Sequence, residues 1–397
     1  IKKRLPKVNK RENFLACSSN RELTVIGIVA KIIMGVPVNV VVISIMRAGR
    51  ANSARVSLVQ VKMDAPRVAV VGGGVVGMTV VRVLQTELPR AHVTLIAENL
   101  GDDTTSCVAA GIFRPGTSFR GPTPEITQRW IDDSWHYWQD ILRSADAPRA
   151  GVTELGAYIF SRENYHVTRN HLIEKLVPVY RAVQDDEMHL CAGDWRHGSY
   201  FSTVKIGCDN YLPWVERSFL QGGGKILREK VVSLSALGGR YELVFNCTGM
   251  GAKQLCRDHD LVPLRGQVLR VRAPWLKTAF YGDYDTYVIP GAGGSATLGG
   301  VRQYDSYDLS ISPHDTAAIR ERCEALLPAL RGAELLAQRV GLRPHRVPVR
   351  VEAEPGRSRV VHCYGHGGYG VTCAPGTALH AVRIGLDLLR GNTRCKI

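Results

Sequence analysis

The chain has 397 residues, of which 45% are hydrophobic and 22% are charged, and it contains 40 glycines. This composition is typical of a globular protein long enough for two domains, and it excludes a disordered, a collagen-like or a short disulfide-rich chain. The ten cysteines are scattered without paired spacing, which argues against a disulfide framework and favours a reducing compartment.

The formal net charge of +15 is concentrated near the N-terminus. Residues 1–62 hold twelve Lys and Arg side chains against only Glu12 and Glu22, whereas the remaining 335 residues hold 39 basic and 34 acidic side chains. The main body is therefore close to balanced. It also has no arginine-rich helix and no zinc-finger spacing, so nucleic-acid binding is not expected.

The basic segment also contains a largely apolar run, residues 23–46, whose length would suit a membrane span. Lys31, Pro37 and Asn39 interrupt this run, and the long charged region before it fits a signal peptide poorly. Met63 stands just before the first clear strand of the body. We therefore expect residues 1–62 to be an extension outside the working protein, with a membrane anchor or a targeting segment as alternatives.

The body begins with a strand, turn, helix and strand. Residues 67–71 are apolar and β-branched and predict a buried strand, and residues 92–97 predict a second one. Between them lies a glycine-rich turn with the Gly-x-Gly-x-x-Gly spacing at Gly72, Gly74 and Gly77, followed by an apolar helical pattern.

This βαβ pattern predicts dinucleotide binding. Gly72 would make the tight turn, Gly74 would let backbone N–H groups approach a pyrophosphate, and Gly77 would let the helix pack closely on the strand. The helix N-terminus favours phosphate charge, and Glu98 can accept hydrogen bonds from ribose hydroxyls. The motif suits NAD and FAD alike, so an NAD-dependent dehydrogenase is one alternative. The other is a non-enzymatic membrane- or nucleic-acid-associated protein led by residues 1–62.

Two later segments fit a long cofactor. Residues 102–111 form a loop of small and hydroxyl residues that could bind phosphate or ribose, or could be a turn without a ligand. Residues 241–251 predict a buried strand that ends in Cys-Thr-Gly. A distant strand that returns to the first βαβ unit is expected where a long cofactor lies across the sheet edge.

Further along the chain, helices and strands alternate irregularly. We expect helices at residues 124–143, 211–220 and 314–327, with Pro213 near the first turn of the second. We expect strands at residues 262–271, 286–290, 296–303 and 360–364, then a glycine-rich loop at 365–370 and a final helix at about 376–389. No linker separates these elements, so two interleaved domains are expected. The cofactor domain would comprise residues 63–115, 200–255 and 340–397, and the substrate domain residues 116–199 and 256–339.

Taken in order, eight segments resemble the D-amino-acid oxidase and D-aspartate oxidase family of FAD enzymes. They are VVGGGVVGMT, TTSCVAAGIFRP, YLPW, NCTGMG, LRGQVLRVRAPW, TLGGVRQ, GLRPHR and YGHGGYGVT, and the resemblance covers about residues 66–390. It implies an α/β fold in which a Rossmann-like FAD domain is interleaved with a mixed-sheet α+β substrate domain. It also implies oxidation of a D-amino acid to an imino acid, hydrolysis to a 2-oxo acid and ammonia, and reduction of O₂ to hydrogen peroxide.

The resemblance implies FAD contacts at many positions. They are Gly72, Gly73, Gly74, Val75, Val76 and Gly77 at the pyrophosphate, Glu98 at the ribose, Thr104, Thr105 and Ser106 near the phosphates, Gly111 and Ile112 beside the flavin, Val231 at the adenine, Thr248 near the cofactor, and Arg343, Gly367, Gly368, Gly370 and Thr372 around the flavin. A helix N-terminus at the last loop would stabilise negative charge on the flavin.

The resemblance also implies substrate contacts. Arg343 would clamp the α-carboxylate through its planar guanidinium, assisted by the Tyr287 hydroxyl, and the Gly368 carbonyl would accept from the amine. Arg302 stands where D-aspartate oxidases have an arginine and would pair with a side-chain carboxylate. We therefore expect acidic substrates such as D-aspartate to be favoured, with oxidation of neutral D-amino acids as the alternative.

Three features depart from the D-aspartate oxidase pattern. The lid between Trp275 and Tyr287 contains Asp283 and Asp285 but no arginine. Arg114 occupies a position that is uncharged in the family members compared, and it either supplies the missing charge or lies on the surface. The YGHGGYG loop is closer to the neutral-substrate branch.

Two remaining patterns concern metals and location. His362, Cys363, His366 and Cys373 have a spacing that permits a metal site, but the glycines among them favour a loop against a flat ligand, so no metal is expected. The tail Cys395-Lys396-Ile397 resembles a peroxisomal Ser-Lys-Leu signal. It predicts recognition by a peroxisomal import receptor and a location in the peroxisomal matrix, with the cytoplasm as the alternative.

Overall fold

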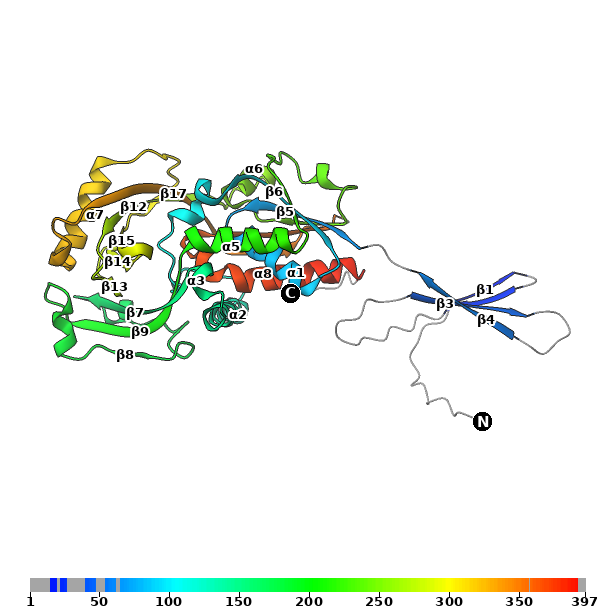
Figure 1. The fold of residues 1–397 in the computed structure, drawn as a ribbon, viewed down its shortest axis with the longest axis horizontal. Helices are drawn as coiled ribbons and strands as arrows, with labels where there is room; N and C mark the ends of the chain where they lie inside the picture. The colour runs from blue at the N-terminus through cyan, green and yellow to red at the C-terminus, as the bar shows by residue number, and fades with distance from the viewer. Residues whose placement is uncertain are drawn as a thin grey trace. The chain divides into compact units, whose positions relative to one another are not determined.

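The computed structural model describes residues 65–356 and 358–391, together with the backbone of four strands between residues 15 and 61 (Figure 1). The chain divides into two compact units, Ile1–Ala65 and Pro66–Ile397. The tail at 395–397 lies outside the described residues, so the peroxisomal location stays a prediction.

The four N-terminal strands form an antiparallel sheet in the order β1–β2–β3–β4. They are β1 (Leu15–Ser19), β2 (Glu22–Ile26), β3 (Val40–Arg47) and β4 (Ala54–Val61). Strands β2 and β3 occupy the two ends of the apolar run that had been considered as a membrane span. Among the helices that the structure describes, none is long and apolar enough to cross a membrane.

A large mixed sheet organises the second unit, and one end of it is parallel (Figure 1). The strand order there is β10–β6–β5–β11–β18. The bounds are β5 (Arg67–Gly73), β6 (His92–Leu100), β10 (Lys225–Leu227), β11 (Leu243–Asn246) and β18 (Val360–His366). With α1 (Val75–Glu87) between β5 and β6, this arrangement confirms the predicted βαβ unit.

Packed helices accompany the parallel strands. Helix α1 contacts α5 (Cys208–Gln221) and α8 (Gly370–Leu389), and α8 contacts α2 (Pro124–Arg143). The Trp130 indole of α2 donates to His380 Nδ1 of α8 at 2.8 Å, and a Cβ on Gly376 would overlap the Trp130 backbone. Helix α2, which the sequence assigned to the substrate domain, thus packs on the last helix of the cofactor domain. The predicted domain limits stay a prediction.

The other half of the sheet is mainly antiparallel. Strand β17 (Leu335–Ala353) pairs with β18 on one side and with β12 (Val262–Arg272) on the other, and so joins the two halves. Beyond β12 come β15 (Ser295–Gly299), β14 (Tyr287–Pro290), β13 (Thr278–Tyr281), β7 (Val152–Ser161), β9 (His197–Ile206) and β8 (Tyr180–Ala182), and β16 (Gln303–Tyr304) pairs with β12 off this path. This mixed α/β architecture confirms the predicted fold class.

Helix α7 (Pro313–Leu326) contacts β12 and β15. The remaining short helices include α3 (Ala147–Ala150), α4 (Tyr165–Thr168), α6 (Ala252–Leu255), and the 3₁₀ turns η1 (Gly101–Asp103), η2 (Thr105–Val108) and η8 (Gly367–Tyr369).

Several predicted bounds were wrong, chiefly around proline. Helix α8 begins at Gly370, not near residue 376, and α5 begins at Cys208, so Pro375 and Pro213 lie inside helices. The strand predicted at 296–303 is interrupted between β15 and β16. Strand β17 was not predicted, because Pro344 and Pro348 argue against a central strand. The structure accommodates Pro348 where the pairing of β17 with β18 shifts register, between His345 and Arg350, and Pro344 lies opposite Pro263 of β12.

Candidate active site

A cavity of about 1140 Å³ extends from the β5–α1 turn to the antiparallel strands. This volume exceeds the roughly 300–1,000 Å³ of an ordinary small-molecule site, so it has room for a long cofactor together with a small substrate. Every residue that the sequence assigned to cofactor or substrate lines the cavity, with the exception of Gly77. A Cβ on Gly77 would overlap the Gly72 carbonyl, so Gly77 serves the packing of helix on strand.

The glycine-rich turn leaves open space where a pyrophosphate is expected. Gly72 has a φ of +115°, and a Cβ there would overlap the Cys247 carbonyl. A Cβ on Gly74 would instead meet only the Ser106 hydroxyl oxygen, at 3.2 Å. That oxygen accepts from the Val75 amide at 2.9 Å, so the hydroxyl-rich loop is tied to the start of α1. The first turn of a helix carries N–H groups without helical partners, which suits a phosphate.

The residues predicted at the ribose and at the adenine lie beside each other on the cavity wall. Glu98 and Val231 both line the cavity, and Glu98 forms an exposed ion pair with Lys230, the residue before Val231, at 3.2 Å. An exposed pair of this kind contributes little stability, so the Glu98 carboxylate stays available to hydroxyl donors.

Thr248 is held in place by a buried amide that the sequence did not reveal. Its hydroxyl donates to Asn246 Oδ1 at 2.8 Å. The Asn246 amide nitrogen in turn donates to Cys256 Sγ at 3.1 Å and to His362 Nδ1 at 3.2 Å. Burial lowers the pKa of His362 to about 4, so its ring is neutral and Nδ1 can accept. The signal available in the sequence was the polar Asn246 in an otherwise apolar strand.

The N-terminus of α8 lies at the cavity. Gly370 and Thr372 line it, and the first turn of α8 holds no acidic residue, so the positive end of the helix dipole is uncompensated there. The Thr372 hydroxyl donates to the Ile112 carbonyl at 3.0 Å and fixes the backbone predicted to lie beside the flavin. The residues present therefore fit FAD along the whole cavity.

Arg343 extends from β17 with one nitrogen anchored. Its Nη1 donates to the Val301 carbonyl at 2.9 Å and more weakly to the Arg265 carbonyl at 3.4 Å. The guanidinium lies over Gly266, where a Cβ would overlap it. Nε and Nη2 make no hydrogen bond to any residue within 65–356 or 358–391. Two adjacent donors are thus available to a carboxylate in the two-point geometry that guanidinium prefers.

Tyr287 lies beside this arginine. Its ring packs against Gly299 and Gly300, and burial raises the pKa of its hydroxyl while the nearby Arg343 charge opposes that rise. The hydroxyl is therefore protonated at neutral pH and can donate a hydrogen bond. The ring of Tyr281, which pairs with Tyr287 across β13 and β14, has its centroid 6.0 Å away and also lines the cavity.

The two acids of the predicted lid lie in the turn of the β13–β14 hairpin, and each of them has a partner. Asp285 pairs with Arg302 at 2.9 Å, and Asp283 pairs with Arg162 at 3.5 Å. The side chains of Arg302 and Asp285 are 47% and 40% exposed, although both line the cavity. The lid therefore presents no unbalanced negative charge from these two acids, which removes the expected conflict with an acidic substrate.

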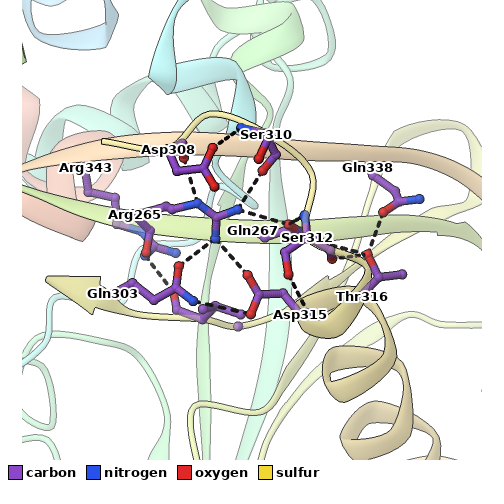
Figure 2. Close-up of polar contacts among 12 residues, drawn as sticks. Arg265, Gln267, Gln303, Asp308, Ser310, Ser312, Asp315, Thr316, Gln338 and Arg343 are labelled. Atoms are coloured by element: carbon purple, nitrogen blue, oxygen red, sulfur yellow. Dashed lines mark hydrogen bonds and ion pairs between the residues drawn. The ribbon is translucent and has the colours of Figure 1, made fainter. Parts of the chain in front are cut away.

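A buried arginine of β12, Arg265, connects this strand with the loop after β16 and with the start of α7 (Figure 2). Arg265 is only 1% exposed and forms an ion pair with Asp315 of α7 at 2.8 Å. Its other nitrogens donate to the carbonyls of Asp308 and Ser310, each at 2.7 Å. These contacts hold the loop after β16 and the start of α7 against β12.

Arg265 also contacts Gln303 and Arg343 (Figure 2). Nη1 of Arg265 donates to Gln303 Oε1 at 2.7 Å, and Gln303 directly follows Arg302 in the chain. The Arg265 carbonyl is also the weaker acceptor for Arg343. A residue that the sequence showed only as part of a motif thus anchors the surroundings of both arginines.

Each histidine of the suggested metal pattern has one ring nitrogen in a hydrogen-bonding contact. His366 Nε2 lies 2.8 Å from the Thr377 hydroxyl, and His362 Nδ1 faces Asn246. In the described part of the chain, one group does bring metal-type atoms close together, namely Asp102, Cys107 and Asp209. Its two acids pair with Arg339 and Arg270.

Comparison with known proteins agrees with this geometry. The family model for FAD dependent oxidoreductases, DAO, matches residues 67–384. The chain belongs to this family. It is 37% identical to D-aspartate oxidase of Homo sapiens over 330 residues, which cover 81% of this chain and 95% of the human enzyme. It is 35% identical to D-amino-acid oxidase of Streptomyces coelicolor over 327 residues, which cover 80% of this chain and 96% of that enzyme.

The fold is also found among solved structures. Glycine oxidase of Bacillus cereus superposes with a TM-score of 0.69 over 83% of this chain and 96% of that one, at 19% identity, which shows the fold alone. Membership of the DAO family makes this chain an FAD-dependent oxidoreductase and confirms FAD as its cofactor. The alternatives of an NAD-dependent dehydrogenase and of a non-enzymatic protein are therefore wrong.

Proposed function

We propose that this enzyme oxidatively deaminates D-amino acids, with acidic ones such as D-aspartate favoured. The observation that carries the proposal is Arg343, whose Nη1 is anchored to the Val301 carbonyl while Nε and Nη2 stay available inside the FAD cavity. Such a fixed guanidinium is suited to hold an amino acid by its α-carboxylate. The D-aspartate oxidase and D-amino-acid oxidase relatives support the same reaction.

The residues then define how a substrate is oriented. The α-carboxylate binds Arg343 and the Tyr287 hydroxyl, and the amine donates to the Gly368 carbonyl. This three-point contact fixes which bond of Cα faces the flavin. When bound, FAD supplies the acceptor for the hydride of Cα, and its reoxidation by O₂ gives hydrogen peroxide. No side chain has to remove a Cα proton, because the hydrogen leaves with its electron pair, and the resulting imino acid takes up water to give a 2-oxo acid and ammonia.

The acidic preference rests on Arg302. It lines the cavity, and a substrate side-chain carboxylate can take the place of Asp285 beside it. One observation favours the second candidate, an oxidase for neutral D-amino acids: Arg302 already has a counterion, so its charge does not need one from the substrate. The pairing of Asp283 with Arg162 supports the first candidate, because it relieves repulsion of an acidic substrate.

The experiment is oxygen uptake by the purified holoprotein with D-aspartate, D-glutamate, D-alanine and L-aspartate. We expect uptake with the D-amino acids, fastest with the acidic pair, together with equal amounts of ammonia and hydrogen peroxide. L-aspartate is the matched control for stereochemistry. Protein that retains FAD but consumes no oxygen with any of the D-amino acids would contradict the proposal.

A further inference from the structure

Arg114 is a cavity residue whose position the family resemblance does not explain. It lies two residues after Ile112, which bridges to Lys205 of β9, and it precedes the buried Pro115. Both Arg114 and Tyr281 line the cavity, and the Arg114 guanidinium carbon lies 4.4 Å from the centroid of the Tyr281 ring. The side chain is therefore directed to the inside of the enzyme, and the alternative of a simple surface residue is not supported.

The charge of Arg114 has no counterion among the residues that the structure describes. Its Nε is buried without a hydrogen-bond partner, and no carboxylate within the described ranges pairs with it. Two other arginines that are stacked on aromatic rings have a carboxylate partner. Arg162 lies over Trp195 and pairs with Asp283, and Arg181 lies over Tyr200 and pairs with Glu187.

A buried donor without a partner is costly, because it has given up its hydrogen bonds to water. Stacking on Tyr281 recovers part of that cost through attraction between the cation and the ring face. It does not satisfy the N–H groups of the guanidinium edge. An anionic ligand that enters the cavity would satisfy them.

The place of Arg114 relative to the substrate follows from a chain of neighbouring side chains. Arg343 lies beside Tyr287, and the Tyr287 and Tyr281 rings are 6.0 Å apart between centroids. Arg114 covers Tyr281. Arg343, Tyr287, Tyr281 and Arg114 thus form a chain of neighbours, and all four side chains line the same cavity.

Arg302 is the other cation at this end, and its situation is different. Asp285 balances it at 2.9 Å, and it is nearly half exposed. A partly buried cation without a counterion attracts a carboxylate more strongly than an exposed and already paired one, because solvent and the partner both screen the latter.

We propose that Arg114 is a specificity-determining residue that binds the side-chain carboxylate of acidic D-amino acids, together with Arg302. This inference rests on the proposed oxidation of D-amino acids and names which residue selects the acidic ones. The lid of this chain has no arginine, and Arg114, which stacks on Tyr281, supplies a cation in its place.

The test compares ligands that differ only in the second carboxylate. Succinate and butyrate have the same chain length, and each is titrated calorimetrically into the holoenzyme. In Arg114→Leu we expect succinate affinity to fall by about 10- to 100-fold, the range for a lost charge-assisted hydrogen bond, with butyrate affinity unchanged or improved. The kcat/KM for D-aspartate should fall by a similar factor relative to that for D-alanine. Arg114→Lys, which keeps the charge, should lie between the two.

Arg82→Leu is the matched control. Arg82 also lies over an aromatic ring, 4.2 Å from the Trp214 centroid, but it does not line the cavity. Its replacement should leave the succinate to butyrate ratio unchanged. An unchanged ratio in Arg114→Leu would overturn the inference.

Two further outcomes are separable. If the wild-type enzyme oxidises no D-amino acid, the proposed function fails. If it oxidises D-aspartate and Arg114→Leu keeps the wild-type substrate ratio, only the role of Arg114 fails.

If Arg114→Leu does not fold, the binding of succinate and butyrate is measured in Arg302→Leu instead. With Arg114 intact, that variant should still prefer succinate over butyrate, and complete loss of the preference would contradict a contribution from Arg114.

Discussion

Arg302 and Asp285 form an ion pair, with 2.9 Å between Nη2 and Oδ1, at the lid end of the FAD cavity. The pair joins the residue expected to select acidic substrates to an acid expected to repel them. The strength of this pair therefore determines how strongly Arg302 attracts the carboxylate of a substrate.

Replacing Asp285 with Asn should release Arg302 without changing the shape of the lid. Half-exposed ion pairs of this kind contribute about 0–1 kcal/mol, so the kcat/KM for D-aspartate should rise by up to about fivefold while that for D-alanine stays the same. Steady-state oxygen uptake with both substrates measures the effect. A fall for D-aspartate would show that Asp285 positions Arg302 more than it competes with the substrate.

Replacing Arg343 with Ala should abolish turnover of every substrate while FAD is retained. Two charge-assisted hydrogen bonds are lost, each worth about 1.5–3 kcal/mol, so kcat/KM should fall by several orders of magnitude for acidic and neutral D-amino acids alike. Visible flavin absorption checks cofactor retention. Arg339→Ala is the control on the same strand, because Arg339 pairs with the exposed Asp102 at 3.6 Å and does not line the cavity. Turnover of Arg343→Ala near the wild-type rate would remove this residue from the site.

Replacing Gly74 with Ala should weaken FAD binding without destabilising the apoprotein. The new methyl group would meet only the Ser106 hydroxyl, at 3.2 Å, but it would stand where the pyrophosphate must approach. Overpacking of this size costs about 1–3 kcal/mol, or roughly 10- to 100-fold in the FAD dissociation constant. Gly101→Ala is the control, since Gly101 has a positive φ of 56° but nothing within 4 Å and lies outside the cavity. Equal FAD affinities in the two variants would contradict the assigned pyrophosphate position.

The sequence predicted well those positions at which the backbone conformation or a known motif allows only one arrangement. Gly72 needs its left-handed conformation and its close approach to Cys247, and the apolar runs of β5, β11 and β18 are buried on both faces. Arg343 and Tyr287 were expected at the substrate, and both line the cavity.

Partners that depend on register between distant strands could not be predicted. Arg162 neutralises Asp283 across 121 residues, and Asn246 meets His362 across 116. Neither pairing leaves a local pattern in the sequence. The burial of Arg265 is of the same kind, because a single charged residue in a strand ordinarily faces solvent.

His362 should make the enzyme sensitive to acid. Burial lowers its pKa from 6.5 to about 4 in the folded state, so the unfolded chain binds its proton first as the pH falls. Its stabilising contribution is thus complete above pH 6.5 and is lost between there and about 4. At about 1.4 kcal/mol per pKa unit, the loss is about 3 kcal/mol. Protonated Nδ1 would also face the Asn246 amide donor, next to Thr248 in the FAD site.

Chemical denaturation of the wild type and of His362→Gln between pH 7 and 4 measures this contribution. The difference in the free energy of unfolding between the two proteins should shrink by about that amount as the pH falls, because the variant has no proton to take up at this position. A difference that stays constant over this range would contradict the buried, neutral histidine.

We propose that this cavity binds a D-amino acid with a carboxylate in its side chain. The most direct measurement is the ratio of kcat/KM for D-aspartate to that for D-alanine, in the wild type and in Arg302→Leu. The variant loses the cation and leaves Asp285 unpaired beside the substrate carboxylate, so the ratio should fall by about 10- to 100-fold, with D-alanine unharmed. An unchanged ratio would contradict the acidic preference and would favour an oxidase of neutral D-amino acids.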